Sequence, residues 1–194
     1  VSYLDLDSTW STPTRLNFCE PKRNEASISM SADERQIYLY EDTTGNGDIY
    51  TTDFYHAKFQ DIEILDMKDV NTDDWETHCM MSNDKRRFFF VSDRKGGFGG
   101  RDIWVTHLLP NGKWGNVENL GEAVNTIGDE SCPFIHADNE TLYFNSNGHQ
   151  GYGMTDLFLS KKVSDSTWTV AQNLGYPINT IDDEGSLIVA ADAK

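Results

Sequence analysis

Carboxylate pairs recur along this chain at places where they could do chemistry. Two of them are Asp129-Glu130 and Asp183-Glu184. Two carboxyl groups at a defined separation are what a glycoside hydrolase needs, one as the acid and one as the base or nucleophile. Clustered oxygens can also hold calcium, and the run Asp-Thr-Thr-Gly-Asn-Gly-Asp at 42–48 contains such a cluster. This run lacks the length and the final glutamate of an EF-hand loop.

The acids repeat, and this repetition favours a structural role over a catalytic one. Asp48, Asp102 and Asp156 are spaced 54 residues apart. An active site is asymmetric and does not require one copy in every unit, whereas a residue that holds each unit together must recur. Asp and Asn oxygens accept hydrogen bonds from nearby backbone amides in tight loops. We therefore expect these acids to fold loops, and the acids that start each unit to form clamps with Arg94 or Arg101.

Other patterns of catalytic or metal-binding residues do not occur in the sequence. The histidines show no HxxxH or HExxH spacing, and there is no Gly-x-Ser-x-Gly elbow. The Gly-rich run 96–100 leads toward a strand, so it offers no helix N-terminus to a phosphate group. The sequence predicts no catalytic residue, no metal site and no cofactor.

The three cysteines, Cys19, Cys79 and Cys132, do not define a disulfide framework. When the units are aligned at 54 residues, Cys132 matches His78 and misses Cys79 by one position. We interpret the cysteines as small buried residues. A bridge between Cys79 and Cys132 remains open at this point.

Each unit reads as four short strands. A short first strand follows the acidic start, and we expect it to end at Asp33, Asp84 or Asp138. An aromatic strand such as 88–91 comes next, and a Gly-rich loop leads to a further strand such as 102–105. A fourth strand starts near Trp114 or Trp168 and ends in Asn-Leu-Gly. We interpret the aromatic residues as the packing between blades, namely Trp10, Trp114 and Trp168 with Phe90, Phe144, Trp104 and Phe158. No stretch has a long 3.6-residue apolar period. Four short strands in a unit of about 40–50 residues indicate an all-β fold, namely a β-propeller of four-stranded antiparallel blades.

The period divides the chain into about three and a half blades. We place a partial blade at 1–24, full blades at 25–75, 76–129 and 130–183, and a partial blade at 184–194. Propellers typically have about four to eight blades, so we expect this segment to be part of a larger ring. The alternative is a small four-bladed ring in which 187–191 pairs beside a strand near 1–6. One strand of that blade would then still be missing.

The repeat resembles the WD40-like β-propeller repeat called PD40. The matching residues are Ser-Asp-Arg-x-Gly-Gly-x-Gly-x-x-Asp-Ile-Trp at 92–104, Trp114, Asn-Leu-Gly at 119–121, Val-Asn-Thr at 124–126 and Asp129-Glu130. The resemblance covers roughly residues 8 to 194. It departs in the first full unit, where Gln60 replaces the tryptophan and the Gly-rich loop is shorter. It implies a cell-envelope protein of the Bacteroidetes type, often with an OmpA-like peptidoglycan-binding domain, and a propeller related to that of TolB.

The net charge of −16 argues against nucleic acid and anionic membrane surfaces as direct partners. No apolar run approaches transmembrane length, and no signal peptide is visible. Together with the resemblance, this composition leads us to expect a periplasmic, outer-membrane-associated protein.

We expect a non-catalytic scaffold module that binds a protein or a glycan. Phe98 and Tyr152 lie at the tips of Gly-rich loops, and exposed aromatic residues beside arginine are typical of contact surfaces. The candidate binding residues are Arg94, Lys95, Phe98, Arg101, His149, Gln150, Tyr152 and Met154. The resemblance implies envelope protein partners, for example in a type 9 secretion machine, and peptidoglycan only through a domain outside this chain. The alternatives are a propeller glycan lyase or hydrolase and the propeller cap of a peptidase.

Overall fold

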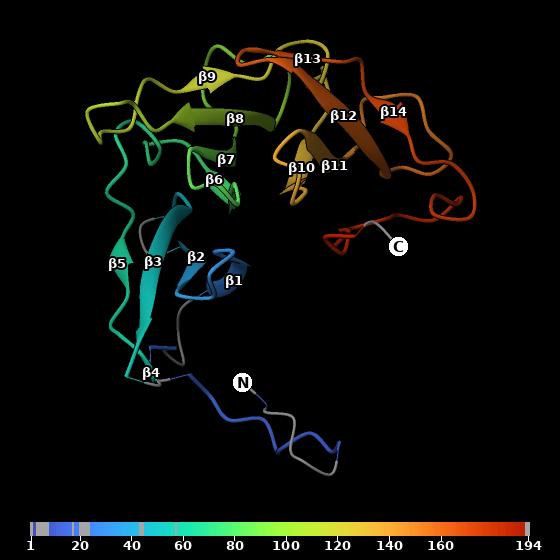
Figure 1. Ribbon diagram of the computed structural model, residues 1–194. Helices are drawn as coiled ribbons and strands as arrows, with labels where there is room; N and C mark the ends of the chain where they lie inside the picture. Colours follow the sequence, from blue (N-terminus) through green and yellow to red (C-terminus); the bar gives the residue numbers. More distant parts are fainter. Residues whose placement is uncertain are drawn as a thin grey trace.

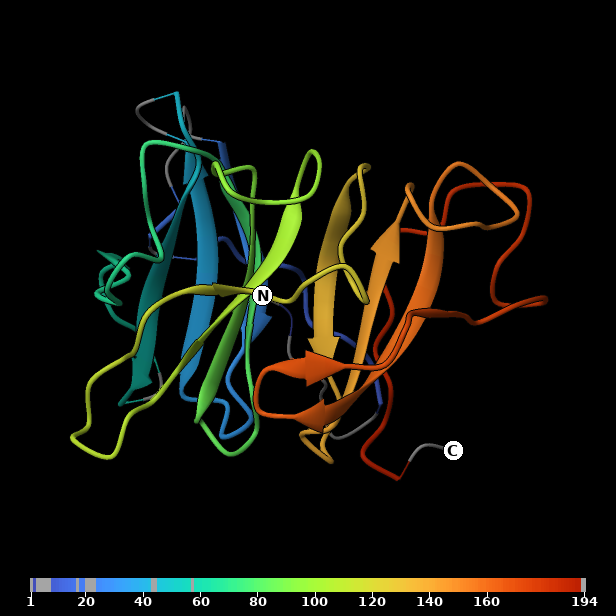
Figure 2. The ribbon, with the colours of Figure 1, turned by 90° about the horizontal axis from the view of Figure 1, so that it is seen from above.

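The computed structural model describes residues 2, 8–16, 18–19, 24–42, 45–56 and 58–192. Their regular structure consists of strands alone, and these residues include no helix that could span a membrane. The strands form three antiparallel sheets along an arc, each with its first strand nearest the centre (Figure 1). Seen from above, the sheets are twisted and stacked beside one another (Figure 2). The expected all-β propeller fold is confirmed.

Each sheet follows the chain as a meander, and we call the sheets the first, second and third blade. The first blade contains β1 (Asn24–Met30), β2 (Gln36–Asp42), β3 (Asp48–Tyr55), β4 (Lys58–Phe59) and β5 (Glu63–Ile64). The second contains β6 (Glu76–Met81), β7 (Arg87–Ser92), β8 (Asp102–His107) and β9 (Glu118–Asn119). The third contains β10 (Glu130–Ile135), β11 (Thr141–Ser146), β12 (Asp156–Ser164), β13 (Thr167–Trp168) and β14 (Gln172–Asn173).

The second strand of the middle blade, β7, is buried on both of its faces. Side chains alternate between the two faces of a strand. Phe89 and Val91 therefore pack toward the third blade, whereas Phe88 and Phe90 pack toward the first. All four have no exposed surface. A strand between two neighbours needs no solvent face, so a continuous apolar run replaces the usual alternation.

The fourth strand is more broken than the sequence analysis expects. In the third blade, the expected strand from Trp168 to Asn-Leu-Gly is divided into β13 and β14, which pair with different halves of β12. In the second blade, a single bridge between Leu108 and Trp114 stands in the place of β13. The outer strand of a blade pairs with a neighbour on one side only. A continuous outer strand would therefore gain little stability over a divided one.

The first strands also end earlier than expected. They end at Met30, Met81 and Ile135, not at Asp33, Asp84 and Asp138. The aspartates lie in the hairpin turns instead, where they accept backbone hydrogen bonds. Asp138 accepts from the N–H groups of Glu140 and Thr141 at 2.8 and 2.9 Å. Burial alone would raise the pKa of Asp138, but these bonds outweigh it and lower the pKa to about 2.

Aromatic packing between blades supplies the core, as expected. The interface of the second and third blades contains Phe89, Val91, Ile103, Val105, Leu120, Val124, Ile135, Leu142, Phe144, Phe158 and Trp168. Trp168 meets Phe89 edge-on, with 5.9 Å between the ring centroids. The expectation is wrong for Trp10, which is 68% exposed. The segment 8–16 around it belongs to none of the three sheets.

An asparagine fastens each interblade loop to the third strand of the blade that it leaves, and two of the three, Asn125 and Asn179, are buried. Asn125 accepts a hydrogen bond from the N–H of Ile103 at 2.8 Å and donates to its carbonyl at 2.9 Å. The same pair of bonds joins Asn71 to Ile49 and Asn179 to Leu157. The side-chain amide thus continues the strand ladder where the short outer strand has ended. This explains why Asn recurs in Val-Asn-Thr.

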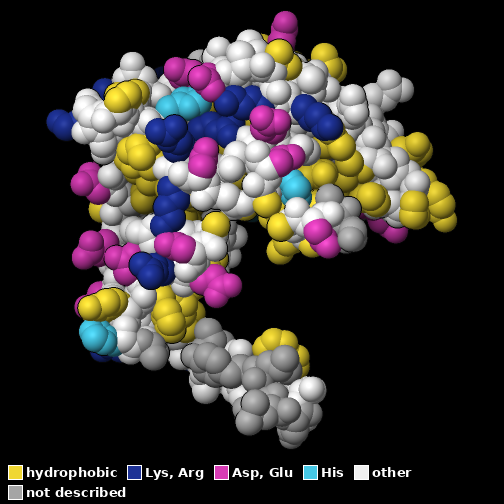
Figure 3. Space-filling model, viewed as in Figure 1, with side chains coloured by type: hydrophobic (Ala, Val, Ile, Leu, Met, Phe, Trp, Pro, Cys, Tyr) yellow, Lys and Arg dark blue, Asp and Glu magenta, His cyan; other side chains and the backbone are white. Residues whose placement is uncertain are grey.

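The turns that join first to second strands, and third to fourth strands, lie at one end of the blades. We call this end the hairpin face, and Figure 3 shows Lys and Arg side chains gathered on it beside Asp and Glu. Lys85 of the second blade donates to Asp33 of the first at 2.6 Å. Arg87 is buried and donates to the carbonyl of Asn139 in the third blade. Neighbouring blades are therefore also linked at this end.

We expect Asn125→Ala to destabilise the protein by about 3 kcal/mol. The substitution leaves the buried N–H of Ile103 without a partner, which costs about 1–3 kcal/mol, and removes one of the two bonds to its carbonyl, which still accepts from the N–H of Leu120. Urea denaturation measures this, with Val170→Ala as the control because Val170 is largely exposed. The control should stay within about 0.5 kcal/mol. A loss for Asn125→Ala as small as that of the control would contradict the role assigned to the amide.

A second prediction concerns Asp33, whose pKa is lowered from 3.8 to about 2, chiefly by the hydrogen bond from Lys85. A depressed carboxyl pKa stabilises the fold above the unfolded value, and this contribution is lost as the pH falls from about 4 through 2. Lys85→Met should raise the pKa of Asp33 toward 3.8. Carboxyl-resolved NMR titration checks this, with Lys95→Met as the control that leaves the pKa unchanged.

Candidate functional site

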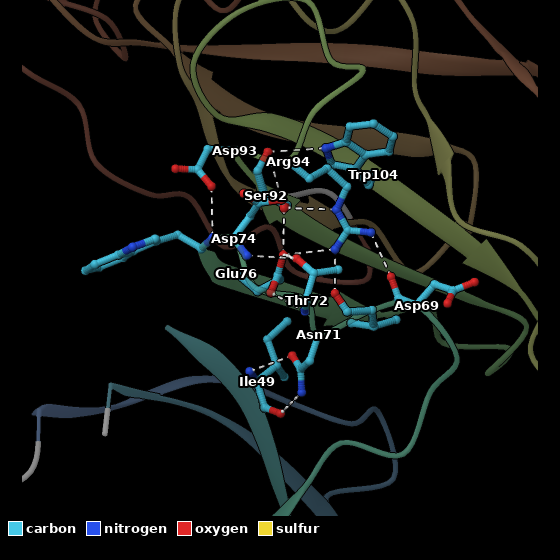
Figure 4. Close-up of polar contacts among 12 residues, drawn as sticks. Ile49, Asp69, Asn71, Thr72, Asp74, Glu76, Ser92, Asp93, Arg94 and Trp104 are labelled. Carbon is cyan, nitrogen blue, oxygen red and sulfur yellow. Dashed lines mark hydrogen bonds and ion pairs between the residues drawn. The ribbon is translucent and has the colours of Figure 1, made fainter. Parts of the chain in front are cut away.

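A buried glutamate at the start of the second blade collects four hydrogen bonds. Glu76 has no exposed surface. It accepts from the backbone N–H and the hydroxyl of Thr72, each at 3.0 Å, and from the hydroxyl of Ser92 at 2.7 Å. The Nη2 atom of Arg94 donates to it at 2.9 Å (Figure 4). The carboxylate thus ties the loop before β6 to the end of β7, which is the clamp that the sequence predicts.

Arg94 extends this clamp to the preceding blade. Its guanidinium donates to the carbonyls of Asp69 and Val70, at 2.7 and 2.5 Å (Figure 4). It also lies over the rings of Phe90 and Trp104, at 4.8 and 5.4 Å from their centroids. A cation on an aromatic face contributes more when it is removed from water. The side chain is only 11% exposed, so its charge interacts with groups of the folded chain and is not presented to a partner.

The third blade builds a similar clamp, with a histidine in the place of the arginine. Glu130 accepts from Thr126 and from the hydroxyl of Ser146, as Glu76 does in the second blade. A ring nitrogen of His149 lies 2.8 Å from the carbonyl of Val124. The imidazole packs against aromatic rings of its own blade, as Arg94 does. Burial raises the pKa of Glu130, and the hydrogen bonds from Ser146 and Thr126 oppose this rise.

The Gly-rich loops curl around an aspartate and point an aromatic residue outward. The carboxylate of Asp102 accepts from the backbone N–H of Phe98 at 2.6 Å. Asp156 does the same for Tyr152. A side chain at Gly97 would collide with the Asp102 carboxylate, because its Cβ would lie 1.7 Å from an oxygen. Burial raises the pKa of Asp102 despite the bonds that it accepts. The repeated aspartates therefore shape the loops, as expected.

Each Gly-rich loop is pressed against the interblade loop that follows it. The backbone N–H of Arg101 donates to Asp129 at 2.9 Å, and the two side chains approach to 3.6 Å. Gly99 lies so close to the backbone of Ile127 that a Cβ would be 2.3 Å from it. We define the loop face as the Gly-rich loops 93–101 and 147–155 with the interblade loops 120–129 and 174–183.

The structure divides the predicted binding residues into two sets. Arg94 and His149 are turned inward and take part in the clamps. The other six are exposed on the loop face, namely Lys95, Phe98, Arg101, Gln150, Tyr152 and Met154. Phe98 is 47% and Tyr152 60% exposed, so the expected exposure of the two loop-tip aromatics is confirmed.

Two further apolar residues on this face were missed by the sequence analysis. Ile127 and Ile181 are 89% and 86% exposed, and they stand 54 residues apart. Each follows an Asn-Thr pair whose asparagine is buried, and each lies in the loop that supports Phe98 or Tyr152. The sequence pattern that could have identified them is an isoleucine that recurs in a loop, directly after Val-Asn-Thr or Ile-Asn-Thr. Such an exposed repeated residue contributes little to the core, which distinguishes it from the clamp residues.

The first strands line a hollow of about 430 Å³ near the centre of the arc. His78, Cys79 and Cys132 face it, and no carboxylate does among the residues the structure describes. Burial lowers the pKa of His78 and raises that of both thiols. Each first strand carries a β-bulge near this hollow. Both cysteines are free, so the bridge left open by the sequence is not formed.

Among the residues that the structure describes, no three His, Cys, Asp or Glu side chains converge in a way that would hold a metal ion. The partner strand near 1–6 that a four-bladed ring would require falls largely outside the described residues, and 187–191 is not in a strand.

We expect Arg94→Met to destabilise the protein by about 3–4 kcal/mol, because it leaves the buried Glu76 carboxylate without its cation. Lys95→Met, one residue away and exposed, should stay within about 0.5 kcal/mol. Thermal or urea unfolding of the two variants measures the difference. Equal stabilities of the two variants would contradict the role of Arg94 in the clamp. Arg94 would then again be a candidate residue of the contact surface.

Comparison with known proteins identifies the fold but not the family. The chain matches no protein-family model and no curated protein. Among solved structures it is similar to a TolB of Agrobacterium tumefaciens, with 15% identity, a TM-score of 0.58, and coverage of 87% of this chain and 55% of that one. It is also similar to TolB from Acinetobacter baumannii, with 14% identity, a TM-score of 0.59, and coverage of 100% and 41%. The chain spans about half the length of these structures, and the likeness shows a shared propeller fold.

Proposed function

We propose that this chain is a non-catalytic propeller module that binds a protein partner through the loop face. The observation that carries the proposal is the pair of exposed apolar residues repeated on neighbouring blades. Phe98 with Ile127 forms the pair of the second blade, and Tyr152 with Ile181 that of the third. Exposed apolar residues that recur in register, outside any core, are typical of a contact surface.

The surroundings of these residues suit a protein contact. Arg101 and Lys95 flank Phe98, and Met154 beside Tyr152 is 79% exposed. Aromatic, methionine and arginine side chains are the types enriched in protein interfaces, and aromatic anchors supply much of the binding energy. The loops are held by Asp102, by Asp156 and by the clamps, so little ordering would be needed on binding.

A cell-envelope setting is part of the proposal. It rests on the resemblance of the repeat to the PD40 type and on the TolB-like fold. We propose a periplasmic, outer-membrane-associated protein whose partners are envelope proteins, possible settings being a type 9 secretion machine or a protein with an OmpA-like domain. Contact with peptidoglycan or another glycan would then belong to a domain outside this chain. The net charge of −16 disfavours nucleic acid as a partner.

The glycan-cleaving alternative receives less support. It requires two carboxyl groups facing one cleft. The central hollow of the arc is lined by no carboxylate among the described residues. A second hollow of about 330 Å³ is lined by Asp129, Asp183 and Glu184. These acids bind groups of the loops: Asp129 contacts Arg101, Asp183 accepts from the N–H of Thr155, and Glu184 accepts from Thr180. Glu130 is held in the clamp.

The binding face is tested with a fourfold variant, Phe98→Ser, Ile127→Ser, Tyr152→Ser and Ile181→Ser. All four residues are exposed, so we expect the melting temperature to change little. Quantitative pull-down from envelope extracts should show at least a tenfold loss of a protein that the parent chain retains. The matched control, Leu109→Ser with Val163→Ser, changes exposed apolar residues on the hairpin face and should retain it.

Identical sets of captured proteins for the fourfold variant and the parent would refute the loop face as the contact surface. Cleavage of any member of a polysaccharide panel by the parent chain would instead favour the enzyme alternative.

A further inference from the structure

A hollow of about 580 Å³ lies on the hairpin face, between the second and third blades. Arg86 and Arg87 of the second blade and Lys162 of the third line it. Lys and Arg side chains gather on this face (Figure 3), although the chain as a whole carries a net charge of −16. A local group of cations in so acidic a chain needs an explanation of its own.

Arg87 is buried beside this hollow, and one of its donor atoms is unused. The residue is 6% exposed. Its Nη2 atom donates to the carbonyl of Asn139, and its guanidinium lies 5.7 Å from the centroid of the Phe89 ring. Among the residues that the structure describes, Nη1 has no hydrogen-bond partner, and no ion pair joins Arg87 to a carboxylate. A buried cation that lacks both is costly, so this atom marks a position at which an anion would be stabilised.

The fold itself does not require a cation at this position. Gln36, Arg87 and Thr141 are equivalent, because each is the first residue of the second strand of its blade. The carbonyl of each accepts the same hairpin hydrogen bond, from Ser31, Ser82 and His136. Gln36 and Thr141 are neutral, and the side chain of each has a partner in its own blade. A residue that every blade needs would recur, so Arg87 serves a task of the second blade alone.

The residue that faces Arg87 across the sheet changes in the same direction. Arg87 pairs with His107 of β8, whereas Gln36 pairs with Asp53 of β3. Gln36 and Asp53 line the corresponding hollow, of about 450 Å³, between the first and second blades. A neutral and an acidic residue in one hollow are thus replaced by a cation and an imidazole in the next. Both replacements make the hollow beside Arg87 more favourable for an anion.

We propose that this hollow binds the carboxylate group of an acidic ligand, with Arg87 as its principal contact. A planar guanidinium matches the geometry of a carboxylate, and a hydrogen bond between two charged groups is stronger than one between neutral groups. Arg86 is exposed in the same lining and adds a second guanidinium. The site lies at the opposite end of the blades from the loop face, so it does not depend on the contact proposed there.

The acidic residues of the lining select the kind of anion. They are Asp84, Glu118 and Asp165. Asp165 already forms an ion pair with Lys162 at 2.6 Å. These carboxylates repel a doubly charged phosphate more strongly than a singly charged carboxylate. They also accept hydrogen bonds from N–H groups beside the bound carboxylate, so an acidic residue within a peptide suits the hollow well.

The probe for this proposal is N-acetylglutamate N-methylamide, in which a side-chain carboxylate stands beside two peptide N–H groups. Titration followed by NMR should give saturable shifts of the Arg87 Nε–H signal and of the amides of 107–109. Arg87→Gln should weaken binding at least tenfold. Glutamine is the residue at the equivalent position of the first blade, so we expect this variant to fold. If it does not fold, Arg86→Gln decides, and this exposed substitution should weaken binding at least threefold.

Lys161→Gln is the matched control in the chain, because Lys161 is exposed and does not line the hollow. N-acetylglutamine N-methylamide is the matched control for the probe, since it has nearly the same shape and no charge. Equal binding of the two probes, equal affinity of the parent chain and the deciding variant, or the absence of saturable shifts would overturn the proposal. Tighter binding of inorganic phosphate than of the probe would do so as well.

Acetate, as a further probe, distinguishes two sources of the carboxylate. Acetate that binds as tightly as the glutamate derivative supports the site and indicates a small free acid as its ligand. Weaker binding of acetate supports the site and indicates an acidic residue of a protein.

Discussion

A carboxylate removed from water stands at the start of the second and third blades, and the arrangement of the loops depends on how it is compensated. Glu76 and Glu130 have no exposed surface. A buried charge is tolerated only if hydrogen bonds or an opposite charge replace its hydration. The donors come from the loop before each blade and from the end of its second strand. One side chain thereby fixes where consecutive blades meet.

That constraint separates two kinds of repetition in the molecule. Residues such as Asn125 and Asp102 recur because each blade needs its own copy to join strands, loops and neighbours. Phe98 and Tyr152 recur in the same register but point away from the core. Because the clamps and the Gly-rich turns hold the loop backbone, these exposed side chains can vary without cost to the blade. A rigid fold and a variable contact surface can therefore share one repeat.

The two ends of the arc differ in how far their apolar side chains are covered. The first blade has its outward apolar residues covered by Leu16 and Phe18. In the third blade, Ile178 is 46% exposed, and Oε2 of Glu184 has no hydrogen-bond partner among the described residues. A propeller blade buries little by itself and is stabilised by the blades beside it, since its sheet is apolar on both faces.

The sequence by itself determined the all-β class, the 54-residue unit, the Gly-rich turns and the clamping role of the acids, because these follow from residue type and spacing. It could not distinguish Arg94 from Lys95, since which of two adjacent cations turns inward depends on the carbonyls and rings of the preceding blade. It also could not distinguish the buried Val124 from the exposed Ile127 three residues later. Burial is a property of packed blades, and only the tertiary structure decides which side of a loop faces a neighbour.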